Sequence, residues 1–522
     1  MSGLSRGMRM AGALAMLAGA LATMGPTSQT SARGSAGPVR GGTLRVALPV
    51  DAGTLDPRLY QDTSAFAVDS LLFDGLVSID NSLTPIPDLA TSWKPVNPTT
   101  WVFHLRQGVK FSNGQPFTAK DVVYTYTTLI DPRLNSPQRQ LYTPIKSVAA
   151  LNPSTVQFNL LYPYAPLLSY LSMGIVPAGS PNNATFATHP IGTGPYVLHA
   201  WQRNDKIDLT RNPVYYGTPP YLNEIVFYVM PDNTAQVTAL KSHSLDLITS
   251  PLPPQDVVSL RQDHNVNIQE ETGDGILYLP LNVRDPVLSD LHVRQAINLL
   301  VDRRAIAQQF FHSIDQAAAT SLLPGTWAYD TSVQIPTADS QQAARILAQD
   351  GWKKDGNGVL AKNGHELSLT LSTYNDPNRV EILTYLQNVL QQAGMKANVV
   401  QTDWPTFLGN VQAHRFQIGI IGALNLYDPD RGMYQGFTTT GTNNWSGYSN
   451  PTVDHLLQQA RQESDRAKRK ALYVRAWTIL NHDLPWIMLT TQGWVAITQQ
   501  NVHGYVTNRT GSMQPLEKVW LS

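Results

Sequence analysis

The residue types that most often hold metals or act as nucleophiles are sparse in this sequence. No cysteine occurs among the 522 residues, so thiolate metal ligands, cysteine nucleophiles and disulfides are all excluded. The twelve histidines stand singly along the chain. His365 and Glu366 begin like the zinc motif H-E-x-x-H, but the second histidine is missing because position 369 is a leucine. We therefore expect no metal site and no cofactor.

Two other patterns resemble catalytic or phosphate-binding motifs without meeting their requirements. Gly192 and Gly194 in PIGTGPY lack the third glycine and the following helix of a phosphate loop, and Pro195 removes a backbone donor. Asp428 and Asp430 in YDPD offer the pair of carboxylates that glycosidases use, but a D-P-D sequence more often forms a turn. The sequence also lacks a P-loop motif and a G-x-S-x-G elbow. We expect no enzyme, and a secreted hydrolase is kept only as an alternative.

The balance of charge argues against a polyanionic partner. Lysine plus arginine and aspartate plus glutamate both number 38, so no global field attracts nucleic acid or an anionic membrane. Only 15% of the residues are charged, whereas 21 tyrosines and 11 tryptophans supply amphipathic aromatic surface. Such side chains suit a ligand cleft, although most of them serve as core. A chain of this length favours two or three lobes over one hydrophobic core.

The first 40 residues read as a targeting segment followed by a tether. Arg6 and Arg9 precede an apolar run from 10 to 24, which is the pattern of a secretory signal peptide over residues 1–24. The run is short for a spanning helix, and an uncleaved anchor is the alternative. Residues 25–40 are small and polar and form a flexible tether. We expect an exported, periplasmic or otherwise extracytoplasmic protein without the cysteine of a lipoprotein.

Hydrophobic periodicity predicts the elements of the mature chain. Residues 43–49 read as a strand, and Thr118 starts a helix with Asp121 three residues later. WVFHL from 101 reads as a strand, with GVKF from 108 as its hairpin partner. The segment 291–311 carries apolar residues at helical spacing. The N-terminal half of the chain is therefore expected to be rich in β-strands.

The last third of the chain shows a repeated order of elements. A strand at 367–371, a helix at 380–393, a strand at 397–401, a helix at 404–413 and the strand FQIGII from 416 follow one another. This β-α-β-α-β order predicts a parallel sheet with helices on its faces. A final long helix begins after Asn450-Pro451 and runs to about Leu480. The fold class is therefore α/β.

Eight blocks of sequence, in order, resemble the family 5 extracellular solute-binding proteins, which are the peptide- and nickel-binding components of ABC importers. The blocks are GGTLRVALPVDAGTLDPRLY from 41, LLFDGLVSID from 71, PIPDLATSWKPVNPTTWVFHLRQGVKFSNGQPFTAKDVVYTY from 85, PIGTGPYVL from 190, RNPVYYGTPPYLNEIVF from 211, LNVRDPVLSDLHVRQAINLLVDRRAI from 281, TDWPTFLGNV from 402 and GYSNPTVDHLL from 447.

The resemblance implies a two-lobed periplasmic-binding-protein fold with an extra inserted N-terminal lobe and a hinge between the lobes. Lobe I would comprise 41–73, 191–280 and 493–522, lobe II 74–190 and lobe III 281–492. It also implies that a small-molecule or peptide ligand is captured between lobes I and III and delivered to a membrane permease. We expect a monomer. A sensor that never feeds transport is the alternative within this fold.

Several positions are candidates for contact with the ligand. The resemblance implies the residues after LDPR, Trp404 and Leu408 in DWPTFL and, by a looser alignment, Tyr142. The aromatic faces of Tyr427 and Trp445 suit stacking on an apolar or sugar face. These positions are Tyr60, Gln61, Asp62, Thr63, Tyr142, Trp404, Leu408, Tyr427 and Trp445. For Trp404, an anchor at the start of a helix is an equal alternative.

Two departures from the peptide binders bear on the ligand. The aspartate that pairs with a peptide α-ammonium is Asn425 here, and an arginine near this strand is Ile420, so one charge-assisted bond of roughly 1.5–3 kcal/mol is missing. Asp62 or Asp428 is the candidate replacement. Arg379 falls at or beside the arginine that clamps a ligand carboxylate in dipeptide binders, and its alternative is a solvated helix residue. A dipeptide, oligopeptide, sugar, metal chelate or organic acid all remain open as the solute.

Overall fold

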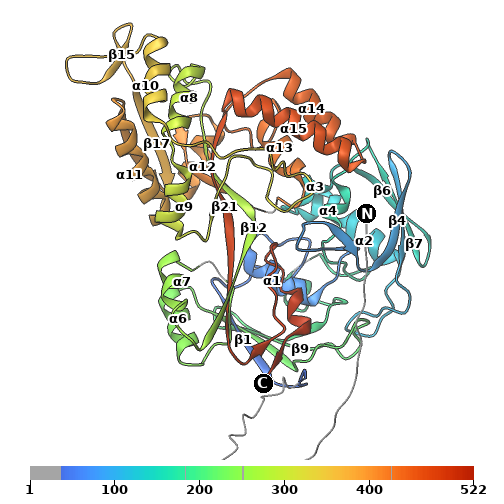
Figure 1. Ribbon diagram of the computed structural model, residues 1–522. Helices are drawn as coiled ribbons and strands as arrows, with labels where there is room; N and C mark the ends of the chain where they lie inside the picture. The colour runs from blue at the N-terminus through green and yellow to red at the C-terminus, as the bar shows by residue number, and fades with distance from the viewer. Residues whose placement is uncertain (1–36, 183, 250–251, 425) are drawn as a thin grey trace, which may run out of the picture. The chain divides into compact units, whose positions relative to one another are not determined.

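A nine-stranded mixed sheet joins the first and last segments of the chain (Figure 1). Its order is β20-β12-β21-β11-β1-β10-β9-β8, and β13 pairs with β21 beside this path. The strands are β1 Thr43–Leu48, β8 Tyr196–Gln202, β9 Lys206–Arg211, β10 Glu224–Val229, β11 Leu247–Ile248, β12 Val266–Pro280, β13 Gln316–Ala317, β20 Ile421–Ala423 and β21 Trp486–Gln499. The predicted first strand is confirmed, since Leu44, Val46 and Leu48 of β1 are buried.

The computed structural model describes residues 37–182, 184–249, 252–424 and 426–522. The predicted signal peptide and most of the predicted tether lie outside these residues. No helix within the described ranges has both the length and the apolar character needed to cross a membrane.

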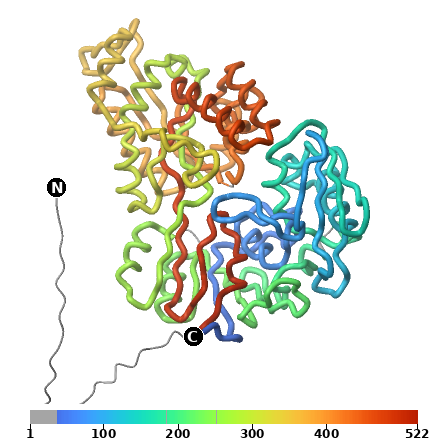
Figure 2. Tube along the Cα trace, turned by 45° about the vertical axis from the view of Figure 1, so that its right-hand side comes forward, coloured from blue at the N-terminus to red at the C-terminus, as the bar shows by residue number. Residues whose placement is uncertain are grey.

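β12 and β21 are neighbours in this sheet and are its two longest strands. They pair antiparallel from Val266 opposite Gln499 to Pro280 opposite Trp486, and the register shifts between Thr272 and Ile276. The tube in Figure 2 shows the red C-terminal segment returning beside the blue N-terminal one, and β11 bridges β21 to β1. Because these strands extend from one group of elements into another, they are the natural place for bending. The boundaries of the three lobes stay a prediction.

Residues 74–190 contain a separate antiparallel sheet in the order β4-β5-β7-β6. Its strands are β4 Ala90–Asn97, β5 Thr100–Leu105, β6 Ile145–Asn152 and β7 Thr155–Leu160. The helix predicted after Thr118 is confirmed as α2, Ala119–Ile130, with Thr118 and Asp121 forming a capping box. The predicted hairpin partner GVKF is wrong. β5 pairs with β4 and β7 instead, and Lys110 forms only an isolated bridge with Pro116.

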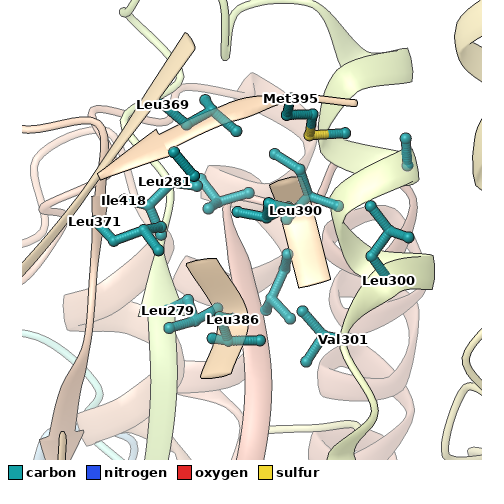
Figure 3. Packing of buried hydrophobic residues seen from close by; sticks show 14 of the residues in the cluster. Leu279, Leu281, Leu300, Val301, Leu369, Leu371, Leu386, Leu390, Met395 and Ile418 are labelled. Atoms are coloured by element: carbon teal, nitrogen blue, oxygen red, sulfur yellow. The ribbon is translucent and has the colours of Figure 1, made fainter. Parts of the chain in front are cut away.

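The predicted parallel sheet of the last third is confirmed. β17 Ser368–Tyr374 pairs in parallel with both β18 Lys396–Thr402 and β19 Ile418–Gly419. The helices α11 Pro377–Gln392 and α12 Trp404–Gln412 connect them. Figure 3 shows the core beneath this sheet, where Leu369 and Leu371 of β17 meet Leu386 and Leu390 of α11.

Three long segments are divided where the sequence pattern predicts continuous elements. FQIGII gives two strands in different sheets, since β19 joins β17 whereas β20 joins β12. The segment 291–311 forms α8 Leu291–Leu300 and α9 Arg303–Phe311, because Asp302 caps a new helix. The final helix is likewise α14 Pro451–Gln462 and α15 Arg466–Asp483, with Asp465 as the second cap.

The remaining elements are short. The helices are α1 Thr63–Leu72, α3 Arg139–Tyr142, α4 Leu167–Tyr170, α5 Ala184–Thr188, α6 Asn233–Lys241, α7 Pro254–Leu260, α10 Ser340–Gln349 and α13 Pro429–Phe437, with 3₁₀ turns η1 Pro132–Leu134 and η2 Gln514–Lys518. The small strands are β2 Val77–Ile79, β3 Pro85–Pro87, β14 Lys353–Lys354, β15 Leu360–Lys362, β16 His365–Glu366, β22 Val502–His503 and β23 Trp520–Leu521.

Candidate functional site

A cavity of about 610 Å³ lies where α1, α3, α4 and α13 meet. Figure 1 shows α13 above α3 and α4, with α1 below them. Four tyrosines from four separate segments line the cavity, and we call it the tyrosine cavity. They are Tyr60, Tyr142, Tyr170 and Tyr427. Its volume falls within the range of about 300–1,000 Å³ that is usual for pockets that enclose small ligands.

The segment that carries Tyr60 is fixed by a buried ion pair. Arg58 donates to both carboxylate oxygens of Asp56, at 2.9 and 2.7 Å, and both side chains are fully buried. The hydroxyl of Ser136 donates to the carbonyl of Arg58 at 2.6 Å, and Gln138 donates to the carbonyl of Tyr60 at 3.4 Å. These bonds tie the segment before α1 to the segment before α3.

Helix α13 is held by two further ion pairs. Asp428, its N-cap, accepts hydrogen bonds from Arg469, and Asp430 accepts from Arg461 at 2.9 Å through each oxygen. Both acids are buried. The first turn of α13, with Tyr427 before it and Arg431 within it, is therefore anchored to α14 and α15.

Uncharged polar side chains make up much of the cavity wall. Amides and hydroxyls come from the segments around and within α1, α3, α4 and α13, from β2 and α12, and from the C-terminal segment. They are Gln61, Ser70, Ser78, Gln138, Gln140, Ser169, Ser172, Gln412, Gln435, Thr442, Asn443, Thr510, Ser512 and Gln514. Such groups donate and accept hydrogen bonds without demanding a charge on the ligand.

Three charged residues also line the cavity: Asp69, Asp88 and Arg431. Burial, together with repulsion from Asp56 and Asp62, raises the pKa of Asp69 well above its usual value. Burial also raises the pKa of Asp88 to about 6, although the hydroxyl of Tyr216 donates to it at 2.6 Å. The cavity therefore holds one permanent cation and two acids that favour their neutral form more than usual.

The aromatic wall is internally connected. The hydroxyl of Tyr142 donates to the carbonyl of Tyr170 at 2.7 Å, and the two rings lie edge to face at 6.4 Å. Tyr60 packs against Phe66 of α1 at 5.6 Å between ring centroids. Burial raises the pKa of Tyr60 to about 12 and raises the pKa values of Tyr142 and Tyr170 as well, so the phenols stay neutral at physiological pH.

A second cavity, of about 300 Å³, is lined by β12, β20 and β21 together with α7, α11 and α12, and we call it the hinge cavity. Arg379 lines it, but its guanidinium already donates to Asp376 at 2.5 Å and to the hydroxyl of Tyr374. Asp315 accepts from Thr490 and from the Gly493 amide, both at 2.9 Å, while burial raises its pKa to about 6. Trp404 and Trp494 supply apolar surface to this cavity.

The predicted ligand-contact residues divide between the two cavities. Tyr60, Gln61, Tyr142 and Tyr427 line the tyrosine cavity, although they come from three distant parts of the sequence. Arg379 and Trp404 line the hinge cavity. Trp404 also begins α12, so both interpretations of this residue agree with its position.

Five other predicted residues line neither cavity and serve the fold. Asp62 is the N-cap of α1 and accepts from the Ala65 amide at 2.7 Å, and Thr63 is the first residue of that helix. Asp428 is occupied by Arg469. Leu408 is half-buried on α12, and Trp445 packs against a core cluster. Asn425 lies outside the described residues.

Sequence reasoning missed Asp69, Tyr170 and Arg431 of the tyrosine cavity. Asp69 could have been found from the sequence, because a single aspartate within the apolar run AFAVDSLLF is expected to be buried, and buried acids are uncommon without a specific role. Arg431 carries no such signal, since an arginine near the start of a helix is ordinary in a sequence. Its importance follows only from which neighbouring acids are already paired.

One cluster of potential metal ligands lies elsewhere, formed by Asp290, His292 and Asp350. Lys362 already donates to Asp290 at 3.3 Å and to Asp350 at 2.7 Å. The ammonium group therefore occupies the position that a cation would take. A third hollow, of about 740 Å³, lies along α2 and the segment that follows it, within residues 120–182.

Comparisons with known proteins extend over nearly the whole chain. The family model of bacterial extracellular solute-binding proteins, family 5 Middle, matches residues 84–445. Protein XP55 of Streptomyces lividans is 30% identical over 96% of this chain and 92% of its own length. The oligopeptide-binding protein AppA of Bacillus subtilis is 26% identical over 95% of each chain. NikA of Brucella suis, in complex with Fe(III)-EDTA, matches with a TM-score of 0.84 at 25% identity, over 92% of this chain and 100% of that one. The predicted fold class is thereby confirmed.

Proposed function

The chain belongs to the bacterial extracellular solute-binding proteins of family 5 and is a substrate-binding protein of an ABC importer, and we propose that it holds its solute in the tyrosine cavity. The observation that carries the proposal is the composition of this cavity. Its wall combines four tyrosines with many amide and hydroxyl groups, which is the mixture of apolar faces and placed polar groups that binding pockets use.

The cavity also draws on all three of the lobes that the family pattern implies. Tyr60 would belong to lobe I, Tyr142 to lobe II and Tyr427 to lobe III. A solute that contacts all three at once favours the closed arrangement of the lobes over the open one, and bending of β12 and β21 is the motion that closes them. Closure then presents a single surface to the membrane permease.

The mechanism is non-covalent capture and release, without chemistry on the solute. The signal pattern of residues 1–24 supports export to the periplasm or another extracytoplasmic space. The equal numbers of acidic and basic residues support a partner that is neither nucleic acid nor a charged membrane surface. The protein acts as a monomer.

Within the tyrosine cavity, Tyr60, Gln61, Tyr142 and Tyr427 contact the solute directly. Relatives with this fold differ in what they hold, since one is named for oligopeptides and another is seen with Fe(III)-EDTA. The solute class therefore has to be argued from this chain's own cavity. Arg379 and Trp404 line the hinge cavity and would contact a solute that is held there.

Thermal unfolding in the presence of a library of small solutes tests this proposal. At least one solute is expected to raise the Tm of the wild type, and the double variant Gln61→Trp/Thr442→Trp, which places two indoles on the cavity wall, is expected to lose this response. Gln349→Trp on the exposed face of α10 is the matched control and keeps it. An equal response from the double variant would place the solute elsewhere.

A further inference from the structure

Three arginines and two aspartates lie at the start of α13, so one arginine there has no aspartate left to pair with. Two acids, Asp428 and Asp430, lie beside Arg431 in sequence, and each is already bound by another arginine. Asp428 pairs with Arg469, and Asp430 pairs with Arg461. Neither of these neighbouring acids is therefore free to pair with Arg431.

Within the described parts of the chain, no acidic side chain forms an ion pair with Arg431. Across the described residues, its guanidinium takes part in none of the hydrogen bonds or ion pairs, whereas Arg379 in the hinge cavity is bound to Asp376. Among the residues known to line the tyrosine cavity, Arg431 is also the only one with a cationic side chain. An unpaired arginine in a cavity is a ready partner for an anion.

The surroundings of Arg431 are aromatic. Burial raises the pKa of Tyr60, Tyr142, Tyr170 and Tyr427, and the positive charge of Arg431 opposes this increase at each of them. The guanidinium therefore lies within electrostatic reach of all four phenols. Because these phenols remain neutral, they do not neutralise the positive charge of Arg431.

We propose that Arg431 binds a carboxylate of the solute through its planar fork, so that the solute of the tyrosine cavity is a small organic acid or the acid end of a larger molecule. This inference rests on the proposed function, because it assigns the solute to the same cavity. It gives the carboxylate-binding role to Arg431 on α13 and not to Arg379 on α11.

The balance of charge in the cavity favours a single negative charge on the solute. One guanidinium matches one carboxylate, whereas a phosphate dianion would need a second cation. The two acids of the wall, Asp69 and Asp88, would repel a dianion whenever they are ionised. Both oxygens of Asp69 lack hydrogen-bond partners within the described part of the chain, so this side chain can receive an N–H or O–H donor of the same solute.

Matched pairs of carboxylates and carboxamides provide the test. The probes are amino acids, dipeptides, sugar acids and short dicarboxylic acids, each beside its amide, with affinity measured by calorimetry after a thermal-shift screen. A carboxylate is expected to bind the wild type at least about 10-fold more tightly than its amide, since a charge-assisted pair is lost. R431Q is expected to weaken the carboxylate by about 10- to 100-fold and to leave the amide unchanged.

Two further variants separate charge from geometry and from general damage. R431K keeps the charge but not the fork, and it is expected to bind the carboxylate with intermediate affinity. R475Q removes an exposed arginine of α15 and is expected to bind as the wild type does.

Three results would overturn the inference: equal binding of an acid and its amide, unchanged binding by R431Q, or stabilisation by none of the carboxylates. If neutral solutes alone stabilise the wild type, the proposed function stands and only the role of Arg431 falls. If no solute of either kind stabilises it, both fall together.

Discussion

Asp428 and Arg469 form a buried two-point ion pair that joins the start of α13 to α15. The Nη1 and Nη2 atoms of Arg469 donate to the two carboxylate oxygens at 2.7 and 2.5 Å, and the side chains are only 4% and 5% exposed. Arg469 also donates to the hydroxyl of Tyr473 and to the carbonyl of Ala460, both at 2.9 Å. The position of Tyr427 and Arg431 in the tyrosine cavity depends on this pair.

Removing Arg469 is expected to be strongly destabilising. In Arg469→Met, the buried carboxylate of Asp428 loses its cationic partner and keeps only the hydrogen bond from the Asp430 amide, so the free energy of unfolding should fall by about 3–5 kcal/mol. Urea denaturation at neutral pH measures the change. Arg475→Met, on an exposed face of the same helix, is the control and should change the free energy by less than about 0.5 kcal/mol. A small effect at Arg469 would contradict the anchoring role.

Gly493 on β21 has no room for a side chain. A Cβ atom there would lie 2.1 Å from the carbonyl oxygen of Ile314, which is backbone and has to shift. We expect Gly493→Ala to destabilise the protein by about 1–3 kcal/mol in urea denaturation. Gly409→Ala in α12, where nothing lies within 4 Å, should instead stabilise by roughly 0.5–1 kcal/mol through helix propensity. The same sign for both variants would show that the close approach at β21 is unimportant.

Asp62 distinguishes a capping role from a ligand-binding role. Asparagine caps a helix as well as aspartate does, so Asp62→Asn should retain stability, whereas Asp62→Ala should lose about 1 kcal/mol. Calorimetry with the solute found in the thermal screen should give the same affinity for Asp62→Asn and the wild type. A large loss of affinity in Asp62→Asn with normal stability would show that Asp62 contacts the solute.

The raised pKa of Asp88 predicts a dependence of stability on pH. Its folded-state pKa of about 6 lies above that of the unfolded chain, so its stabilising contribution is full below about pH 4 and is lost as the pH rises through 6. The difference in unfolding free energy between wild type and Asp88→Asn should therefore decrease by at most about 3 kcal/mol from pH 4 to pH 7. Urea denaturation at four pH values measures it, and a constant difference would contradict the raised pKa.

Much of the fold follows from local patterns in the sequence. The strand at Thr43–Leu48 and the Thr118 cap were predictable because their signals depend on neighbouring residues alone. The predictions fail where pairing between distant segments of the chain determines the structure. FQIGII reads as one strand, but Ile418 and Ile421 join different sheets because the chain crosses between β17 and β12 there.

The candidate site was predictable only in part. Tyr60 follows the LDPR motif, so the resemblance implies its contact with the ligand, whereas Tyr427 was a candidate only because of its aromatic face. Arg431 could not be found this way, because its role depends on Asp428 and Asp430 being paired with Arg469 and Arg461, which follow 31 or more residues later. Pairing between distant side chains leaves no periodicity in a sequence.

Native mass spectrometry of the protein purified with its bound solute tests the central claim most directly. The wild type is expected to carry a non-covalent species small enough for a cavity of about 610 Å³, and Gln61→Trp/Thr442→Trp prepared in parallel is expected to appear as the bare polypeptide. Gln349→Trp should match the wild type. The same bound species in the double variant, or a wild type that neither carries nor takes up any solute, would contradict the account.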